Sequence, residues 1–81
     1  MSRFTYIYIL QSQIESERFY IGRTKNLRGR LSSHNAGNVR HTRWKPWRVK
    51  TYVAVLDSAL GIALERYFKS SAGGVFIKKS L

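Results

Sequence analysis

Two short tyrosine-rich motifs, at residues 6–8 and 20–22, precede an arginine and a histidine that lie four residues apart, Arg30 and His34. Phenol and imidazole groups can accept or donate protons, and a guanidinium binds an oxyanion through a permanent charge. Hydrolysis of a phosphodiester requires such groups, because it needs an activated water, neutralised phosphate charge and help for the leaving oxygen. These side chains can act together only if the strands and helices that carry them place them close to one another.

The two motifs lie in segments with the composition of β-strands. Residues 4–10 and 18–22 are rich in aromatic and β-branched residues, and the polar segment between them suits a hairpin connection. The predicted cross-strand pairs are Tyr8 with Tyr20 and Tyr6 with Gly22. Because side chains alternate along an extended chain, both motifs would then share one face of the sheet.

A short helix is predicted after the second motif, ending near residue 35. Its end signals are Thr24 or Asn26 as the N-cap and Asn35, Gly37 and Asn38 as stop residues. At about 100° per residue, Leu27 and Leu31 form the buried stripe of this helix. Arg30 and His34 lie one turn apart on one flank of the stripe, so we expect both to face along the sheet.

One more strand and one more helix are predicted further along. Val49–Leu56 alternates in hydrophobicity as a strand does, and Pro46 excludes a helix from the basic loop before it. A second helix is expected from a cap at Asp57 or Ser58 to about Ser70. Its predicted apolar face consists of Leu60, Ala63, Leu64, Tyr67 and Phe68.

The C-terminal segment is predicted to pack on the core. Gly73–Gly74 is expected to end the preceding segment, and residues 75–77 to form a short helical turn. The order ββαβα plus this turn describes one α+β domain over residues 1–81. Its centre would be a small three-stranded antiparallel sheet flanked by helices.

The net charge of +11 restricts the partners that the chain can have. Between Arg18 and Leu56 there are ten Lys or Arg residues and no carboxylate. Such a segment repels itself unless a polyanion is near, and counterion release from a phosphate backbone is the usual reason for it. An anionic membrane would attract the same charge, but no basic amphipathic helix with a broad apolar face is evident. We therefore expect a nucleic acid partner and no membrane.

Length and composition limit the class of protein. A chain of 81 residues has room for one core, and a hydrophobic fraction of 43% is sufficient for an ordered domain. The absence of cysteine excludes a disulfide framework and a thiolate metal site, and gives weak support for the cytosol. No apolar run approaches the roughly 20 residues of a bilayer span, and the first residues do not resemble a signal peptide. We expect a soluble, cytoplasmic protein.

A basic segment with two tryptophans follows the predicted first helix. It interleaves cations with aromatic rings, as nucleic-acid-binding surfaces do, through Arg40, Arg43, Trp44, Lys45, Trp47, Arg48 and Lys50. We predict that Trp47 anchors the loop on the core and that Trp44 contacts nucleic acid. Nothing in the chain resembles a base-reading element, so low sequence specificity is expected.

These motifs together resemble the GIY-YIG endonuclease family, in particular its small stand-alone members and the amino-terminal nuclease domain of the excision-repair protein UvrC. Residues 6–8 take the place of the first motif, and residues 20–22 match the second without change. Arg30, eight residues after the second motif, matches the catalytic arginine. Segments 63–69 and 73–79 resemble the glutamate-bearing helix and the basic C-terminal segment.

The resemblance extends to His34, which is followed by asparagine as in the small members. Two positions depart from the family pattern. Tyr6 replaces the glycine for which the family is named, and Arg23 stands where UvrC-like domains often carry lysine. Neither departure implies a loss of activity.

The resemblance implies a metal-binding role for Glu65. It would bind a single divalent cation, Mg²⁺ or Mn²⁺, and magnesium commonly accepts one or two carboxylates beside substrate phosphate. By its spacing alone, Glu65 forms an i,i+4 surface pair with Lys69 equally well. At the level of sequence both interpretations stay open.

The other catalytic candidates are Tyr8, Tyr20, Arg30 and His34. The resemblance favours Tyr20 as the group that orients or deprotonates the attacking water, with Tyr8 as its partner, although a phenol with a pKa near ~10 needs neighbouring cations for this. Arg30 would grip the scissile phosphate. His34 would protonate the leaving group, contact phosphate or pack on the helix stripe, and Asn35 would cap the helix or contact DNA.

The predicted function is metal-dependent DNA cleavage by an endonuclease of low sequence specificity in repair or recombination, with RNA as an open alternative substrate. Selectivity for a branch, flap or nick is one further hypothesis, and a protein partner that supplies specificity is another. The alternatives are a non-catalytic DNA- or RNA-binding module on the same fold and a protein that brings the domain to a repair complex. The nucleic-acid-binding candidates are Arg23, Lys25, Arg28, Asn35, Arg40, Arg43, Trp44, Lys45, Lys69, Lys78 and Lys79.

Overall fold

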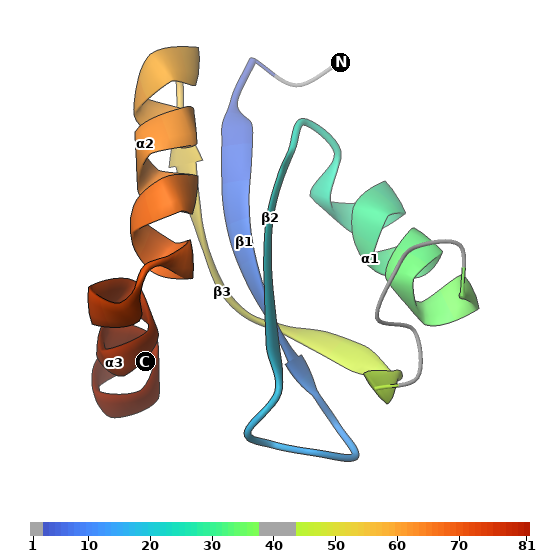
Figure 1. The fold of residues 1–81 in the computed structure, drawn as a ribbon. Coiled ribbons are helices and arrows are strands. Elements are labelled where there is room, and N and C mark those ends of the chain that lie inside the picture. Colours follow the sequence, from blue (N-terminus) through green and yellow to red (C-terminus); the bar gives the residue numbers. More distant parts are fainter. Residues whose placement is uncertain (1–2, 38–43) are drawn as a thin grey trace.

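The computed structural model describes residues 3–37 and 44–81 and has the α+β organisation that the sequence predicts (Figure 1). In chain order its elements are β1 (Thr5–Ser12), β2 (Phe19–Thr24), α1 (Leu27–Ala36), β3 (Trp47–Val55), α2 (Ser58–Lys69) and α3 (Ser71–Ser80). The strands form one three-stranded antiparallel sheet in the order β2-β1-β3. No helix in the described part of the chain is long and apolar enough to cross a membrane.

The central strand β1 separates two hydrophobic clusters. Ile7 and Ile9 point to one face, where they pack with Phe68 of α2 and Ile77 of α3. On the other face, Tyr8 and its neighbours Leu10 and Trp47 pack against α1 through Leu27 and Leu31. Figure 1 shows the consequence, with α1 on one side of the sheet and α2 and α3 on the other.

The predicted register of the β1–β2 hairpin is wrong by two residues. Tyr8 lies opposite Gly22, and Leu10, not Tyr8, lies opposite Tyr20. Tyr6 lies opposite Thr24, so it does not cover Gly22. A shift of two residues preserves the alternation of faces, and therefore both tyrosine motifs still share the α1 face.

Two local interactions account for the observed register. The hydroxyl oxygen of Ser12 accepts hydrogen bonds from the main-chain N–H groups of Ile14 (3.2 Å) and Glu15 (3.1 Å), and the N–H of Ser12 donates to the carbonyl of Arg18 (3.0 Å). This side chain closes the connection and extends β1 to residue 12. At the other end of the hairpin, the ring of Tyr8 occupies the space where any residue but glycine would place a Cβ at position 22.

The third strand begins two residues before its predicted start, and it contains an irregularity. Ile9 pairs with Thr51 and Leu10 with Val49, so Lys50 is an extra residue on β3. A bulge of this kind reverses which residues of a strand face a given side. Val49, before the bulge, and Tyr52, after it, therefore both face α1.

The first helix agrees closely with its predicted ends. The Asn26 side-chain oxygen accepts a hydrogen bond from the N–H of Gly29 (3.0 Å), which makes Asn26 the N-cap. Gly37 ends the helix in the left-handed conformation, with φ of 84°. Because both ends depend on side chains within three positions of the terminus, local sequence was sufficient to predict them.

The apolar face of α2 is rotated from its predicted position. Asp57 caps the helix as expected, its side chain accepting hydrogen bonds from the N–H groups of residues 59 and 60. The closest approach to the sheet is at Gly61, where an added Cβ would lie 3.4 Å from atoms of Thr5 and Val55. As a result, Leu60 and Tyr67 of the predicted face remain 49% and 45% exposed.

The C-terminal segment is a full helix and not a short turn, and Gly73–Gly74 lies within it. The prediction of a glycine stop signal is therefore wrong. Ser70 connects the two helices, since its N–H donates to the Tyr67 carbonyl (3.0 Å) and its hydroxyl accepts from the N–H of Gly73 (3.1 Å). Gly73 is pressed against the backbone of Tyr67, so a side chain there would collide with it. The glycine permits close packing of α3 on α2, where it buries Ile77.

Candidate active site

Three of the predicted catalytic side chains, Tyr8, Tyr20 and His34, meet on the α1 face of the sheet. We call them the Tyr–His cluster. The Tyr8 hydroxyl lies 3.2 Å from Nε2 of His34, and the Tyr20 ring packs edge-on against the imidazole with centroids 4.5 Å apart. Tyr8 is 2% exposed and His34 is fully buried. The prediction placed His34 on the flank of the helix stripe, whereas it belongs to the core.

The position of His34 depends on the next residue. The side-chain amide of Asn35 donates to the carbonyl of Trp47 (3.0 Å), and its oxygen accepts from the Trp47 N–H (2.5 Å). This pair of hydrogen bonds fastens the last turn of α1 to the start of β3. Both ends of the Asn35 amide are engaged with main chain, so the structure gives it a positioning role that neither sequence hypothesis included.

The Tyr8 phenol is a poor acid in this setting. Its pKa is raised from 10.0 to about 12, chiefly by burial and also by the nearby Tyr20, while the positive charge of Arg30 acts in the opposite direction. The carboxylate of Glu65 also raises the pKa of Tyr8. Tyr8 is therefore a protonated phenol at neutral pH, and it is suited to donating a hydrogen bond or holding a proton.

The charged side chains of Arg30 and Glu65 both affect the pKa of Tyr8. Although α1 and α2 cover opposite faces of the sheet, the charges of both residues act on the Tyr8 phenol. Arg30 is exposed on α1, and none of the four carboxylates of the chain pairs with it among the described residues. Its guanidinium therefore has its donors available to an anion in solution.

Glu65 is held by two cations. Its Oε1 accepts a hydrogen bond from Nε of Arg23 (2.9 Å), and its Oε2 contacts Nζ of Lys69 (3.0 Å). Burial opposes ionisation, but the hydrogen bonds from Lys69 and Arg23 outweigh it and hold the pKa of the Glu65 carboxyl below its usual range. The i,i+4 pair considered from the sequence is present, and the link to Arg23 joins α2 to the edge strand β2.

A metal ion would find an ionised ligand here but no complete protein site. Within residues 3–37 and 44–81, no three His, Cys, Asp or Glu side chains are grouped so that they could hold a metal. Each oxygen of Glu65 accepts one hydrogen bond and retains a second lone pair. The chemistry of this donor fits an ion that takes one carboxylate and completes its shell with water and phosphate.

The predicted nucleic-acid-binding residues do not gather on one surface. Lys25 and Arg28 lie near α1 on one side of the sheet, whereas the cations of α2 and α3 lie on the other. These are Lys69, which pairs with Glu65, Lys78, whose Nζ is 3.9 Å from Glu17, and the exposed Lys79. Lys45 is exposed before β3, and Arg40 and Arg43 lie outside the described residues.

The two tryptophans differ as predicted in burial. Trp47 is 3% exposed and anchors the start of β3. Trp44 is partly buried, its carbonyl accepts a hydrogen bond from the Ser12 hydroxyl (2.5 Å), and the guanidinium of Arg18 lies 4.3 Å from its ring centre. Sequence reasoning did not anticipate the Arg18 contact, because the two residues lie far apart in the chain.

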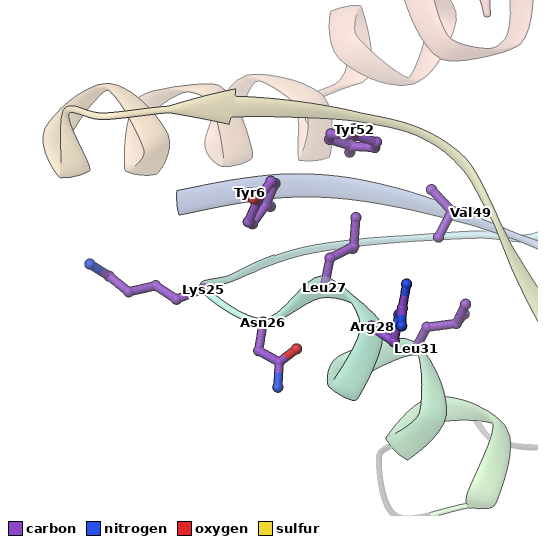
Figure 2. Close-up of a pocket in the computed structure, with 8 residues that line it drawn as sticks. All are labelled: Tyr6, Lys25, Asn26, Leu27, Arg28, Leu31, Val49 and Tyr52. Carbon is purple, nitrogen blue, oxygen red and sulfur yellow. The ribbon is translucent and has the colours of Figure 1, made fainter. Parts of the chain in front are cut away.

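A groove of about 780 Å³ lies beside the Tyr–His cluster, and sequence reasoning missed it as well (Figure 2). We call it the aromatic groove. It is lined by Tyr6, Lys25, Asn26, Leu27, Arg28, Leu31, Val49 and Tyr52. The bulge that turns Tyr52 to this face leaves no signal in the hydrophobic pattern.

Comparison with known proteins identifies the family of the chain. Searches of curated proteins and of solved structures gave no match. The family model described as the GIY-YIG catalytic domain matches residues 4–73, a range that contains the Tyr–His cluster, Arg30 and Glu65. Nucleases of this family are in general dependent on divalent metal ions. The chain therefore belongs to the GIY-YIG catalytic domain family, which is a family of nucleases.

Proposed function

We propose that the protein is a divalent-metal-dependent DNA endonuclease of low sequence specificity that acts in repair or recombination. The observation that carries the proposal is the Tyr–His cluster, whose Tyr8 phenol also feels the charges of Arg30 and Glu65, although these groups come from β1, β2 and two helices on opposite faces of the sheet. An exposed cation, a pair of phenols and an ionised carboxylate can supply the charge neutralisation, the water orientation and the metal ligand that hydrolysis of a phosphodiester needs.

The roles follow from exposure and protonation. Arg30 is the exposed cation and binds the scissile phosphate. Tyr20 is less buried than Tyr8 and orients the attacking water. Tyr8 stays protonated, and its contact with Nε2 of His34 links the phenol to an imidazole that can pass a proton.

Glu65 is the residue that would hold a magnesium or manganese ion, with substrate phosphate oxygens as further ligands. When bound, such an ion supplies Lewis-acid neutralisation of the charge that develops on phosphate. Arg23 and Lys69 keep the Glu65 carboxylate ionised and fix its orientation, which favours metal binding. Because both cations contact the oxygens that the metal ion would bind, they also compete with the ion for Glu65. We infer that metal affinity without DNA is weak.

One observation favours a second candidate, a non-catalytic DNA- or RNA-binding module on the same fold. Both oxygens of Glu65 are neutralised by cations, which is the arrangement expected of a structural ion pair between α2 and β2. In such a protein the charge of +11 would still bind polyanions, and affinity would fall steeply with salt.

Incubation of supercoiled plasmid and branched DNA with the protein distinguishes the two. We expect nicking with Mg²⁺ or Mn²⁺, none with excess chelator, and a loss of at least about 10²-fold in rate for Arg30→Ala and Glu65→Gln, the scale at which one transition-state contact acts. Arg66→Ala and Glu17→Gln are matched controls, because both residues are exposed and lie outside the site. Equal rates for the site variants and these controls would refute the assignment. A wild-type protein that binds DNA and cuts none would support the binding module.

A further inference from the structure

The aromatic groove lies next to the Tyr–His cluster on the same face of the sheet. Tyr52 of β3 is the direct cross-strand neighbour of Tyr8, and Tyr6 lies two residues from Tyr8 on the same face of β1. At a rise of about 3.4 Å per residue, Tyr6 is displaced from Tyr8 by about 7 Å along the strand. A strand of nucleic acid whose scissile phosphate is bound beside the cluster would therefore bring an adjacent nucleotide to the groove.

The walls of the groove are aromatic and aliphatic. The rings of Tyr6 and Tyr52 meet edge to face with centroids 5.7 Å apart, and Tyr52 is 53% exposed. Figure 2 shows α1 opposite these rings, with Leu27 and Leu31 directed toward the sheet. A flat, apolar group can therefore contact an open phenol ring and an aliphatic surface together.

The rim of the groove is cationic. Lys25 and Arg28 belong to it, both are exposed, and none of the described residues that line it carries a carboxylate. In Figure 2 the Lys25 side chain extends away from the aromatic rings toward solvent. The preferred occupant of the groove is thus an apolar, planar group attached to an anion. The volume of the groove, about 780 Å³, lies within the range of about 300–1,000 Å³ that is typical of small-ligand sites.

We propose that the aromatic groove binds one unpaired nucleotide of the substrate strand, with its base on Tyr52 and its phosphate at Lys25 and Arg28. This proposal rests on the proposed function, because it requires that the substrate is a nucleic acid. A paired base inside a duplex cannot present its ring face to Tyr52, whereas an unpaired one can. The groove therefore selects DNA with a bulge, flap or single-stranded end beside the cleavage site, and it does so without reading sequence.

The net charge of the chain favours a nucleotide over a second copy of the chain as the occupant of the groove. A second copy would bring its own net charge of +11 to a cationic rim, which is unfavourable at ordinary ionic strength. A nucleotide brings the opposite charge.

The test compares paired and unpaired DNA in excess chelator, so that binding is measured without cleavage. Fluorescence anisotropy gives Kd for a short duplex with one unpaired nucleotide and for the fully paired duplex of the same sequence. For Tyr52→Ala we expect a loss of about 5- to 150-fold on the DNA with the unpaired nucleotide, which corresponds to one base–aromatic stacking contact, and less than about twofold on the paired duplex. Tyr52→Phe keeps the ring and should bind as wild type does.

Tyr67→Ala is the matched control, because Tyr67 is 45% exposed and lies on α2, beyond the other face of the sheet. It should leave both Kd values unchanged. Equal losses on the two DNAs for Tyr52→Ala, no loss on either, or a wild-type protein without preference for the unpaired nucleotide would each overturn the proposal. A concentration-dependent dimer that Tyr52→Ala dissociates, seen by analytical ultracentrifugation, would overturn it in favour of a second copy.

The outcome is separable from that of the proposed function. Plasmid nicking with no selective loss for Tyr52→Ala would refute the groove assignment and leave the endonuclease intact. A selective loss in a protein that cuts no DNA would keep the assignment and refute the endonuclease.

Discussion

Substitution of Gly22 by alanine tests the packing at the centre of the site. The added Cβ would collide with the hydroxyl and Cζ of Tyr8 and would lie 2.9 Å from its Cε1. The ring cannot withdraw freely, because it is 2% exposed and its hydroxyl contacts His34 at 3.2 Å. Either the ring or strand β2 must move.

The expected cost is the sum of two effects. Overpacking of a filled core costs about 1–3 kcal/mol. Loss of the Tyr8–His34 hydrogen bond adds about 0.5–1.5 kcal/mol. We therefore expect Gly22→Ala to lower the free energy of unfolding by about 1.5–4.5 kcal/mol, a large part of the roughly 4–12 kcal/mol typical of a domain of this size.

Urea denaturation followed by tryptophan fluorescence measures this change. In a Tyr8→Ala background the obstruction is gone, so Gly22→Ala should then cost less than about 0.5 kcal/mol, and the double-mutant cycle should show strong coupling. Gly74→Ala is the control, since no atom lies within 4 Å of its added Cβ, and alanine should stabilise α3 by about 0.5–1 kcal/mol. Additive effects of Gly22→Ala and Tyr8→Ala, or relief by Tyr6→Ala instead, would refute the observed register.

Three further predictions concern stability. Because the folded pKa of Tyr8 is raised from 10.0 to about 12, its contribution to stability is fully present below pH 10 and is lost as the pH rises toward about 12. The free energy of unfolding measured in urea should therefore fall by up to about 2–3 kcal/mol over this interval, and Tyr8→Phe should reduce the fall. Asn35→Ala removes both hydrogen bonds to the Trp47 main chain, so thermal unfolding should show a loss of about 1–3 kcal/mol, while Asn26→Ala at the other end of α1 should cost about 0.5–2 kcal/mol. Gly73→Ala forces α3 away from the Tyr67 backbone and should destabilise by about 1–3 kcal/mol, in contrast to Gly74→Ala; a stabilising Gly73→Ala would contradict the observed helix packing.

Features that depend on neighbouring residues could be predicted from the sequence. The ends of α1 are an example, because the Asn26 cap and the left-handed Gly37 act within one helical turn. The Asp57 cap of α2 is another. The strands and the shared face of the tyrosine motifs also follow from local alternation, which is the same for any register shift of two residues.

Features that depend on packing between distant segments could not be predicted. Periodicity indicated an apolar stripe on α2, but the approach of Gly61 to the sheet decided how that helix is rotated. Gly73 has the composition of a helix stop, and only its contact with Tyr67 shows that it permits a close crossing of two helices. The extra residue at Lys50, which brings Tyr52 to the face of Tyr8, has no pattern of its own.

The sequence by itself determined the fold class, the family resemblance and the set of chemically able side chains, because types, spacing and local alternation carry that information. Only the tertiary structure decided which of those side chains meet. It buried His34 against Tyr8, tied Glu65 to Arg23 across the sheet edge and placed the aromatic groove next to the cluster. These outcomes depend on close packing between distant segments, such as those of Arg23 and Glu65, which are 42 residues apart, and no local pattern of the chain encodes it.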